Sequence, residues 1–66
     1  MSALIDRARR VCREAGVLDK FEDAVSALLD AIERNDLRAY RSARDALLRL
    51  PGVGSKTINE IERRSR

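Results

Sequence analysis

The residues whose types and spacing could do chemistry in this sequence lie in one short segment, residues 50–61. Gly52 and Gly54 allow a tight reversal of the chain and leave nearby backbone N–H groups uncovered by side chains. Ser55 can cap a following helix, whose first turn presents free N–H groups and the positive end of the helix dipole. Because an anion can bind directly at such a place, the segment predicts a phosphate-binding hairpin between two helices.

The side chains around the two glycines support the same chemistry. Lys56 adds a full positive charge, and the Thr57 hydroxyl can donate a hydrogen bond to a phosphate oxygen. Pro51 cannot continue a helix and pushes Leu50 out of the helical region, so the preceding helix must end there. The apolar residues that we expect to tie the hairpin to its helices are Val53, Ile58 and Ile61.

This segment resembles the helix-hairpin-helix motif, in which an apolar residue, often Pro, is followed by Gly, an apolar residue, Gly, any residue, Lys, and Thr or Ser. The resemblance covers about twelve of the 66 residues. In that family the hairpin binds DNA through its backbone without reading bases. The DNA contacts that the resemblance implies are Gly52, Val53, Gly54, Ser55, Lys56 and Thr57. The alternative is a helical turn that needs two glycines and binds nothing.

Apolar residues recur at helical spacing through the rest of the chain, and no segment alternates as a strand would. The sequence therefore predicts an all-α fold, a compact four-helix domain. The helices that we expect are Ala3 to Ala15, about Lys20 to Arg34, Leu37 to about Arg49, and about Lys56 to Arg63. The helix ends that we expect are Gly16 after the first, Asp19 paired with Glu22 before the second, Asn35 and Asp36 before the third, and Ser55 before the fourth.

The apolar stripes of these helices define the expected core. Its members are Leu4, Ala8, Val11, Cys12 and Ala15 in the first helix, Phe21, Ala24, Val25, Leu28 and Ile32 in the second, and Leu37, Tyr40, Leu47 and Leu48 in the third. Cys12 lies on the apolar side, so we expect a buried packing thiol rather than a reactive one.

A weak internal repeat relates residues 11–25 to residues 47–61 at an offset of 36. It places Gly16 on Gly52 and Lys20 on Lys56, whereas Leu18 stands where the second glycine of the hairpin would be. Two interpretations remain open. The stretch from Ala15 to Asp19 is a degenerate second hairpin that completes the core, or two amphipathic helices are similar by chance.

Length and composition narrow the classes of function. A chain of 66 residues makes one domain, residues 1–66, too small to enclose a large catalytic pocket. One cysteine and no histidine provide neither a disulfide nor a Cys/His zinc site, and the commonest general base is absent. We expect no enzyme activity, cofactor, metal or small-molecule substrate. Without an apolar segment long enough to span a membrane or serve as a signal sequence, we expect a cytoplasmic protein, associated with the nucleoid if bacterial.

Charge is segregated along the chain. The net charge is +3 over residues 1–13, −5 over residues 14–36 and +5 over residues 37–66. Such a domain can bring its two basic segments to one face and point the acidic middle helix away from it. That arrangement suits a one-sided contact with DNA. The alternative is that these charges only keep the exposed faces of the helices hydrated.

The order of elements is similar to that of the C-terminal domain of the bacterial RNA polymerase alpha subunit. A first helix with an arginine near its start and a Gly-apolar end is followed, after a helical region, by the segment from Leu50 to Ile61. In that family the arginine and the Gly-x-Lys-Ser/Thr segment enter or flank the DNA minor groove. The contacts that this resemblance implies are Arg7, Arg10, Gly54, Lys56 and Thr57. The middle helix is longer and more acidic than we would expect of that family, and the chain lacks the linker and subunit body that precede that domain.

These observations favour a non-enzymatic DNA-binding domain, a small transcription-related regulator that grips duplex DNA through its backbone, largely without regard to sequence. A protein partner or homodimer would raise its occupancy of DNA. A first alternative is a protein-interaction module that docks through its acidic middle helix, for example on RNA polymerase. A second alternative is the detached DNA-targeting domain of a repair nuclease or helicase.

Overall fold

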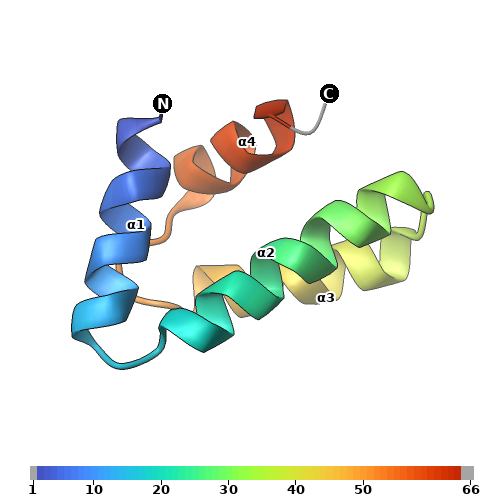
Figure 1. The fold of residues 1–66 in the computed structure, drawn as a ribbon. Coiled ribbons are helices and arrows are strands. Elements are labelled where there is room, and N and C mark those ends of the chain that lie inside the picture. Colours follow the sequence, from blue (N-terminus) through green and yellow to red (C-terminus); the bar gives the residue numbers. More distant parts are fainter. Residues whose placement is uncertain (1, 65–66) are drawn as a thin grey trace.

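Four helices make up the fold. A computed structural model describes residues 2–64, which form helices and no strand. The helices are α1 (Ala3–Glu14), α2 (Leu18–Glu33), α3 (Leu37–Leu48) and α4 (Ser55–Arg64) (Figure 1). The predicted all-α class and four helices are confirmed, and the helix bounds agree with the prediction to within two residues at each end.

Two of the helix caps follow the sequence prediction. The Asp36 carboxylate accepts a hydrogen bond from the Ala39 N–H at 3.1 Å and so caps α3. At the end of α1, Gly16 adopts a φ of +77°, and the next N–H, that of Val17, donates to the Cys12 carbonyl at 2.8 Å. A left-handed glycine with this hydrogen bond closes the helix as expected.

Two other predicted caps are wrong by one or two residues. Helix α2 begins at Leu18, so Asp19 lies inside the first turn, and Val17 holds the cap position without a side-chain hydrogen bond. Helix α4 begins at Ser55, and its first hydrogen bond runs from the Ile58 N–H to the Gly54 carbonyl at 3.1 Å. Gly54, not Ser55, therefore holds the N-cap position of α4, because the carbonyl of the N-cap residue accepts that first bond.

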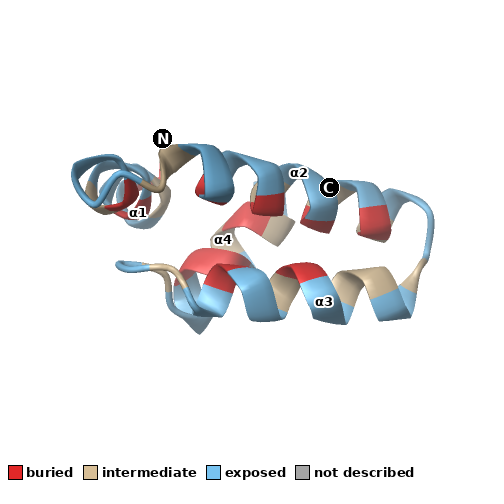
Figure 2. Cartoon of the chain, turned by 90° about the horizontal axis from the view of Figure 1, so that it is seen from below, coloured by how far each residue is buried: buried red, intermediate tan, exposed pale blue. Residues whose placement is uncertain are grey.

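The helices pack as two pairs around one core. Helices α2 and α3 run antiparallel beside each other; α1 stands at the end of this pair where α2 begins, and α4 lies above the pair, against α1 (Figure 1). Buried residues line the facing sides of α2 and α3 and the side of α4 turned toward them (Figure 2). The buried apolar cluster consists of Ala8, Cys12, Phe21, Ala24, Leu28, Ala43, Leu47, Ile58 and Ile61. The predicted stripes of all four helices thus contribute to one core.

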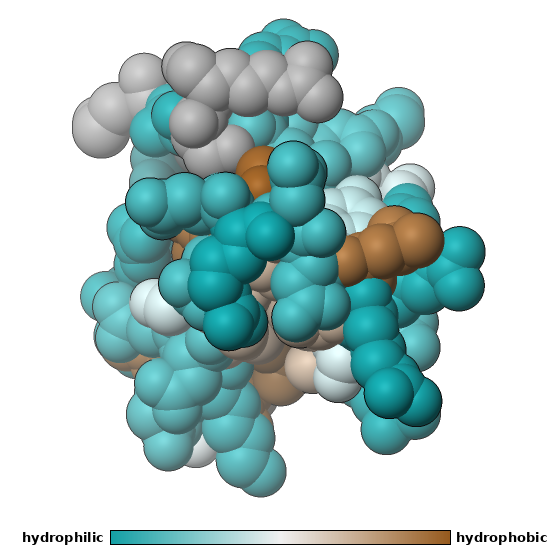
Figure 3. Space-filling view, turned by 90° about the vertical axis from the view of Figure 1, so that its right-hand side faces the viewer, coloured by the Kyte–Doolittle hydropathy of each residue, from teal (hydrophilic) through white to brown (hydrophobic). Residues whose placement is uncertain are grey.

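Four residues predicted to be in the core are exposed. Leu37 is 61% exposed, Leu48 is 44% exposed and Leu4 is 37% exposed, while Ala15 sits in the turn after α1. Leu37 and Leu48 are the first and last residues of α3, where the neighbouring helix no longer covers the surface. Seen from the end that holds the α2–α3 turn, the surface is mostly hydrophilic, with few hydrophobic side chains between the polar ones (Figure 3).

The turn between α3 and α4, residues 49–54, packs closely against α1. Gly52 adopts a φ of +76°, and a Cβ placed on it would lie 2.8 Å from the Val11 Cβ. Next to it, the Cys12 thiol donates a hydrogen bond to the Pro51 carbonyl at 3.4 Å. Burial of Cys12 is therefore confirmed, and burial raises the pKa of its thiol. Only a glycine at position 52 meets both the backbone and the space requirement.

The two turns related by the internal repeat agree in one respect only. Gly16 and Gly52 share nearly the same left-handed φ. The α1–α2 connection, however, has three residues, 15–17, whereas the α3–α4 connection has six, 49–54. The predicted degenerate hairpin from Ala15 to Asp19 extends into α2, so the repeat does not hold over the whole connection.

A partly buried hydrogen bond also links α4 to α3. The Tyr40 hydroxyl donates to the Glu62 carboxylate at 2.7 Å. This hydrogen bond, followed by desolvation, raises the pKa of Tyr40. The bond joins the first turn of α3 to the last turns of α4.

We expect Gly52→Ala to destabilise the fold more than Gly16→Ala. Both substitutions force alanine into the left-handed region, at a cost of about 1–2 kcal/mol, but only Gly52→Ala adds an overlap with Val11, for about 1–3 kcal/mol more. Urea unfolding of the two variants measures the difference. Equal losses would contradict the close approach between α1 and the turn.

We expect Tyr40→Phe to lower the stability by about 1 kcal/mol near neutral pH and to flatten its fall at high pH. The folded-state pKa of Tyr40 is raised, so its contribution is fully present below the unfolded value near 10.0 and is lost as the pH rises through the folded value. Thermal unfolding of both proteins between neutral pH and about pH 11 measures the slope. Parallel curves would show that Tyr40 does not donate to Glu62.

Candidate nucleic-acid interface

A shallow hollow of about 460 Å³ lies where α1 meets the turn and the start of α4. Its lining consists of Leu4, Arg7, Gly52, Val53, Gly54, Ser55, Lys56 and Thr57. All six hairpin residues that the sequence singled out are therefore brought together, and Arg7 joins them from α1. Arg10, the remaining predicted residue, is exposed one helical turn beyond Arg7 and does not line the hollow.

The backbone around the hollow offers a run of hydrogen-bond donors. No N–H group of residues 52–57 donates to an acceptor within residues 2–64, the part of the chain that the structure describes. The last three of these groups belong to the first turn of α4, where no carbonyl is in position to accept them. Six consecutive donors at the positive end of a helix favour an anion.

The start of α4 differs from the starts of the other helices. Side-chain oxygens of Ser2 and Asp36 cap α1 and α3, and Asp19 places a negative charge in the first turn of α2. The first turn of α4 contains no acidic residue and carries Lys56 instead. Of the four helix starts within residues 2–64, this one alone has neither an acidic residue in its first turn nor a side-chain hydrogen bond to its first N–H groups.

The two cations of the hollow are free to meet a ligand. Arg7 and Lys56 are exposed, and neither forms an ion pair with any residue in the described range 2–64. Glu60, one turn after Lys56, instead pairs with Arg63 at 3.6 Å. Because no acidic side chain lines the hollow, its charge is wholly positive.

The remaining lining residues differ in how much surface they offer. Thr57 is only 4% exposed, and nothing within residues 2–64 accepts or donates a hydrogen bond at its hydroxyl. Val53 is half-buried and packs against the core, as predicted. Leu4, which the sequence assigned to the core, lies at the rim, and its spacing of three residues from Arg7 could have indicated a shared face.

Gly54 has a different role from Gly52. A Cβ at position 54 would meet no atom within 4 Å, and the backbone there is not left-handed. The fold itself therefore tolerates a side chain at Gly54. That side chain would project into the open space of the hollow, where the glycine leaves the donors accessible.

Comparison of the chain with known protein families, with curated proteins and with solved structures finds no match. Within residues 2–64, no group of three or more acidic, cysteine or histidine side chains is arranged to hold a metal ion. None of the described helices is long and apolar enough to cross a membrane.

We expect Gly54→Asp to make the fold more stable. Asp is a better N-cap residue than Gly, and its charge complements the helix dipole, so the gain is about 0.5–1 kcal/mol. Gly54→Asn supplies the same cap without the charge and serves as the matched control. Urea unfolding should rank Asp above Asn and Asn above the parent chain. A loss of stability in both variants would contradict the N-cap position of Gly54.

Proposed function

We propose that this chain is a non-enzymatic DNA-binding domain that grips duplex DNA through its phosphate backbone. The observation that carries the proposal is that within residues 2–64 the N–H groups of residues 52–57 have no acceptor and lie in a hollow lined by two unpaired cations and no acid. Phosphate contacts position a protein on DNA without reading its sequence. The binding should accordingly be largely independent of sequence.

In this mechanism the hollow holds one DNA strand. The N–H groups of residues 52–57 and the Lys56 ammonium bind consecutive phosphate oxygens, and the Thr57 hydroxyl supplies a further donor. Arg7 and Arg10, one turn apart on α1, reach the other strand or the minor groove between the strands. Leu4, exposed beside Arg7, offers an apolar surface to the sugars.

The biological setting that we propose follows from the resemblance of this segment to helix-hairpin-helix domains and of its element order to the RNA polymerase alpha C-terminal domain. The chain would act in the cytoplasm, at the nucleoid in a bacterium, as a small regulator of transcription. A single hollow with few phosphate contacts binds weakly, so a protein partner or a second DNA-binding unit would raise its occupancy.

A docking function for α2 is the competing candidate. Its exposed acids include Asp19, Glu22 and Asp23, none of which forms an ion pair within residues 2–64. Such a surface could dock on a basic protein. It leaves the unpaired donors and cations at the start of α4 without a role, and for that reason we favour DNA.

We expect the parent chain to bind a random-sequence duplex with a salt slope of about −3 to −5, because three to five phosphates are neutralised. Lys56→Gln should weaken binding and reduce the magnitude of that slope by about 1. Lys20→Gln is the matched control, since Lys20 holds the equivalent place in the internal repeat but lies among acids. Fluorescence anisotropy over a range of salt concentrations measures both slopes.

Gly54→Asp separates loss of binding from loss of folding. It should stabilise the fold and yet remove DNA binding, because its carboxylate occupies the donors and repels phosphate. Gly54→Asn should retain part of the binding. If Lys56→Gln and Gly54→Asp both bind as the parent chain does, the hairpin does not hold the DNA and the docking function gains support.

A further inference from the structure

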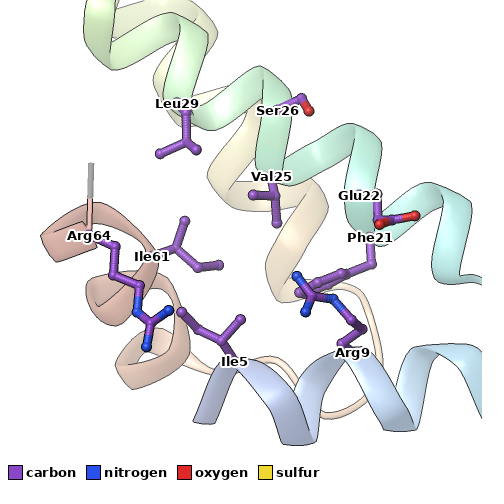
Figure 4. A pocket seen from close by; sticks show the side chains of 9 residues that line it. All are labelled: Ile5, Arg9, Phe21, Glu22, Val25, Ser26, Leu29, Ile61 and Arg64. Carbon is purple, nitrogen blue, oxygen red and sulfur yellow. The ribbon is translucent and has the colours of Figure 1, made fainter. Parts of the chain in front are cut away.

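A second depression lies on the other flank of α1, between α1, α2 and α4 (Figure 4). It has a volume of about 280 Å³. Buried Phe21 and Ile61 form its floor, and half-buried Ile5, Val25 and Leu29 form its walls. We call it the α1–α2–α4 groove. Its apolar surface is continuous with the core of the domain.

The rim of the α1–α2–α4 groove carries both signs of charge on opposite sides. Arg9 rises from α1 and Arg64 from α4, whereas Glu22 projects from α2 (Figure 4). All three are exposed, and none forms an ion pair with another residue in the range 2–64. One wall of the groove is therefore cationic and the other anionic.

The α1–α2–α4 groove is separate from the hollow that we propose binds DNA. Arg7 and Arg9 are two residues apart on α1, which places them about 200° apart around the helix axis. Arg7 lines the hollow and Arg9 lines the groove, and the two lining sets share no residue. A ligand in one site therefore does not cover the other.

We propose that the α1–α2–α4 groove is where two copies of this chain associate about a two-fold axis. In a dimer with a two-fold axis, the same surface of each copy forms the contact. A residue on one wall of the groove therefore meets a residue on the opposite wall of the other copy. The cationic wall of one copy then faces the anionic wall of the other, and Arg9 of each copy pairs with Glu22 of its partner. The half-buried apolar side chains of the groove walls, Val25 and Leu29 among them, pack against those of the other copy.

The area of the contact indicates what kind of dimer to expect. A standard interface takes about 800 Å² from each partner, which would be about a sixth of the 4771 Å² surface of this chain. The groove is lined by nine residues, fewer than the roughly 20–30 that a standard interface takes from each partner. The dimer is accordingly a weak, concentration-dependent one, and it leaves both DNA hollows accessible. The proposal does not depend on the function assigned to the hollow.

Sedimentation equilibrium of the full chain from about 10 µM to about 1 mM tests the association, because a dissociation constant of 1 mM marks the weak end of measurable binding. We expect a monomer–dimer equilibrium. Arg9→Glu and Glu22→Arg should each raise the dissociation constant at least tenfold, since each places like charges opposite one another. The control substitutions are Arg13→Glu and Asp23→Arg, on the same helices but outside the groove, and they should change it much less.

A mixture of the two groove variants provides the decisive test. A copy with Arg9→Glu and a copy with Glu22→Arg have complementary rims, so an equimolar mixture should form a heterodimer about as tightly as the parent chain dimerises, although each variant alone associates at least tenfold more weakly. Circular dichroism confirms that each variant is folded. A parent chain that stays monomeric up to 1 mM would overturn the proposal. So would folded variants that alone dimerise as tightly as the parent chain, or that associate no more tightly when mixed than each does alone.

Discussion

The close contact between α1 and the turn before α4 is the constraint on which the rest of the structure depends. Gly52 lies against Val11 with no room for a Cβ, and the Cys12 thiol donates to the Pro51 carbonyl. This contact fixes the hairpin on α1 and so brings Arg7 beside Lys56. Without it, the two cations would lie on separate helices with no common ligand.

The two flanks of α1 line two separate depressions. The flank with Arg7 borders the turn at residues 49–54, while the flank with Arg9 faces α2 and α4. The basic helix α1 thus contributes a cation to each of two depressions, Arg7 to one and Arg9 to the other. Charge separated along the sequence is only partly separated in the fold, because Arg9 and Arg64 share the rim of the α1–α2–α4 groove with Glu22.

The sequence predicted what local rules determine. Helical periodicity, Pro51, Gly16 and Asp36 located the helices and several of their ends, because each acts through its own backbone or its nearest neighbours. The caps at Asp19 and Ser55 were misplaced since an unassisted backbone at Val17 or a neighbouring glycine at Gly54 can start a helix one or two residues earlier. Leu37 had the residue type of a core position, but no neighbouring helix covers it.

The sequence could not predict how elements that are distant along the chain pack together. The hairpin residues were found from their spacing, but their contact with Val11 and the exposed position of Leu4 depend on how α1 packs. The distinct roles of the two glycines also needed the fold, since one is demanded by packing and the other is not.

The central claim is that DNA binds at the hollow. Titration of the isotopically labelled chain with a short random-sequence duplex, followed by amide NMR shifts, tests it most directly. The account predicts that the largest shifts fall on residues 52–57, with further shifts at Arg7 and Arg10. Shifts confined to the acidic face of α2 or to the α1–α2–α4 groove, or no shifts at low salt, would contradict it.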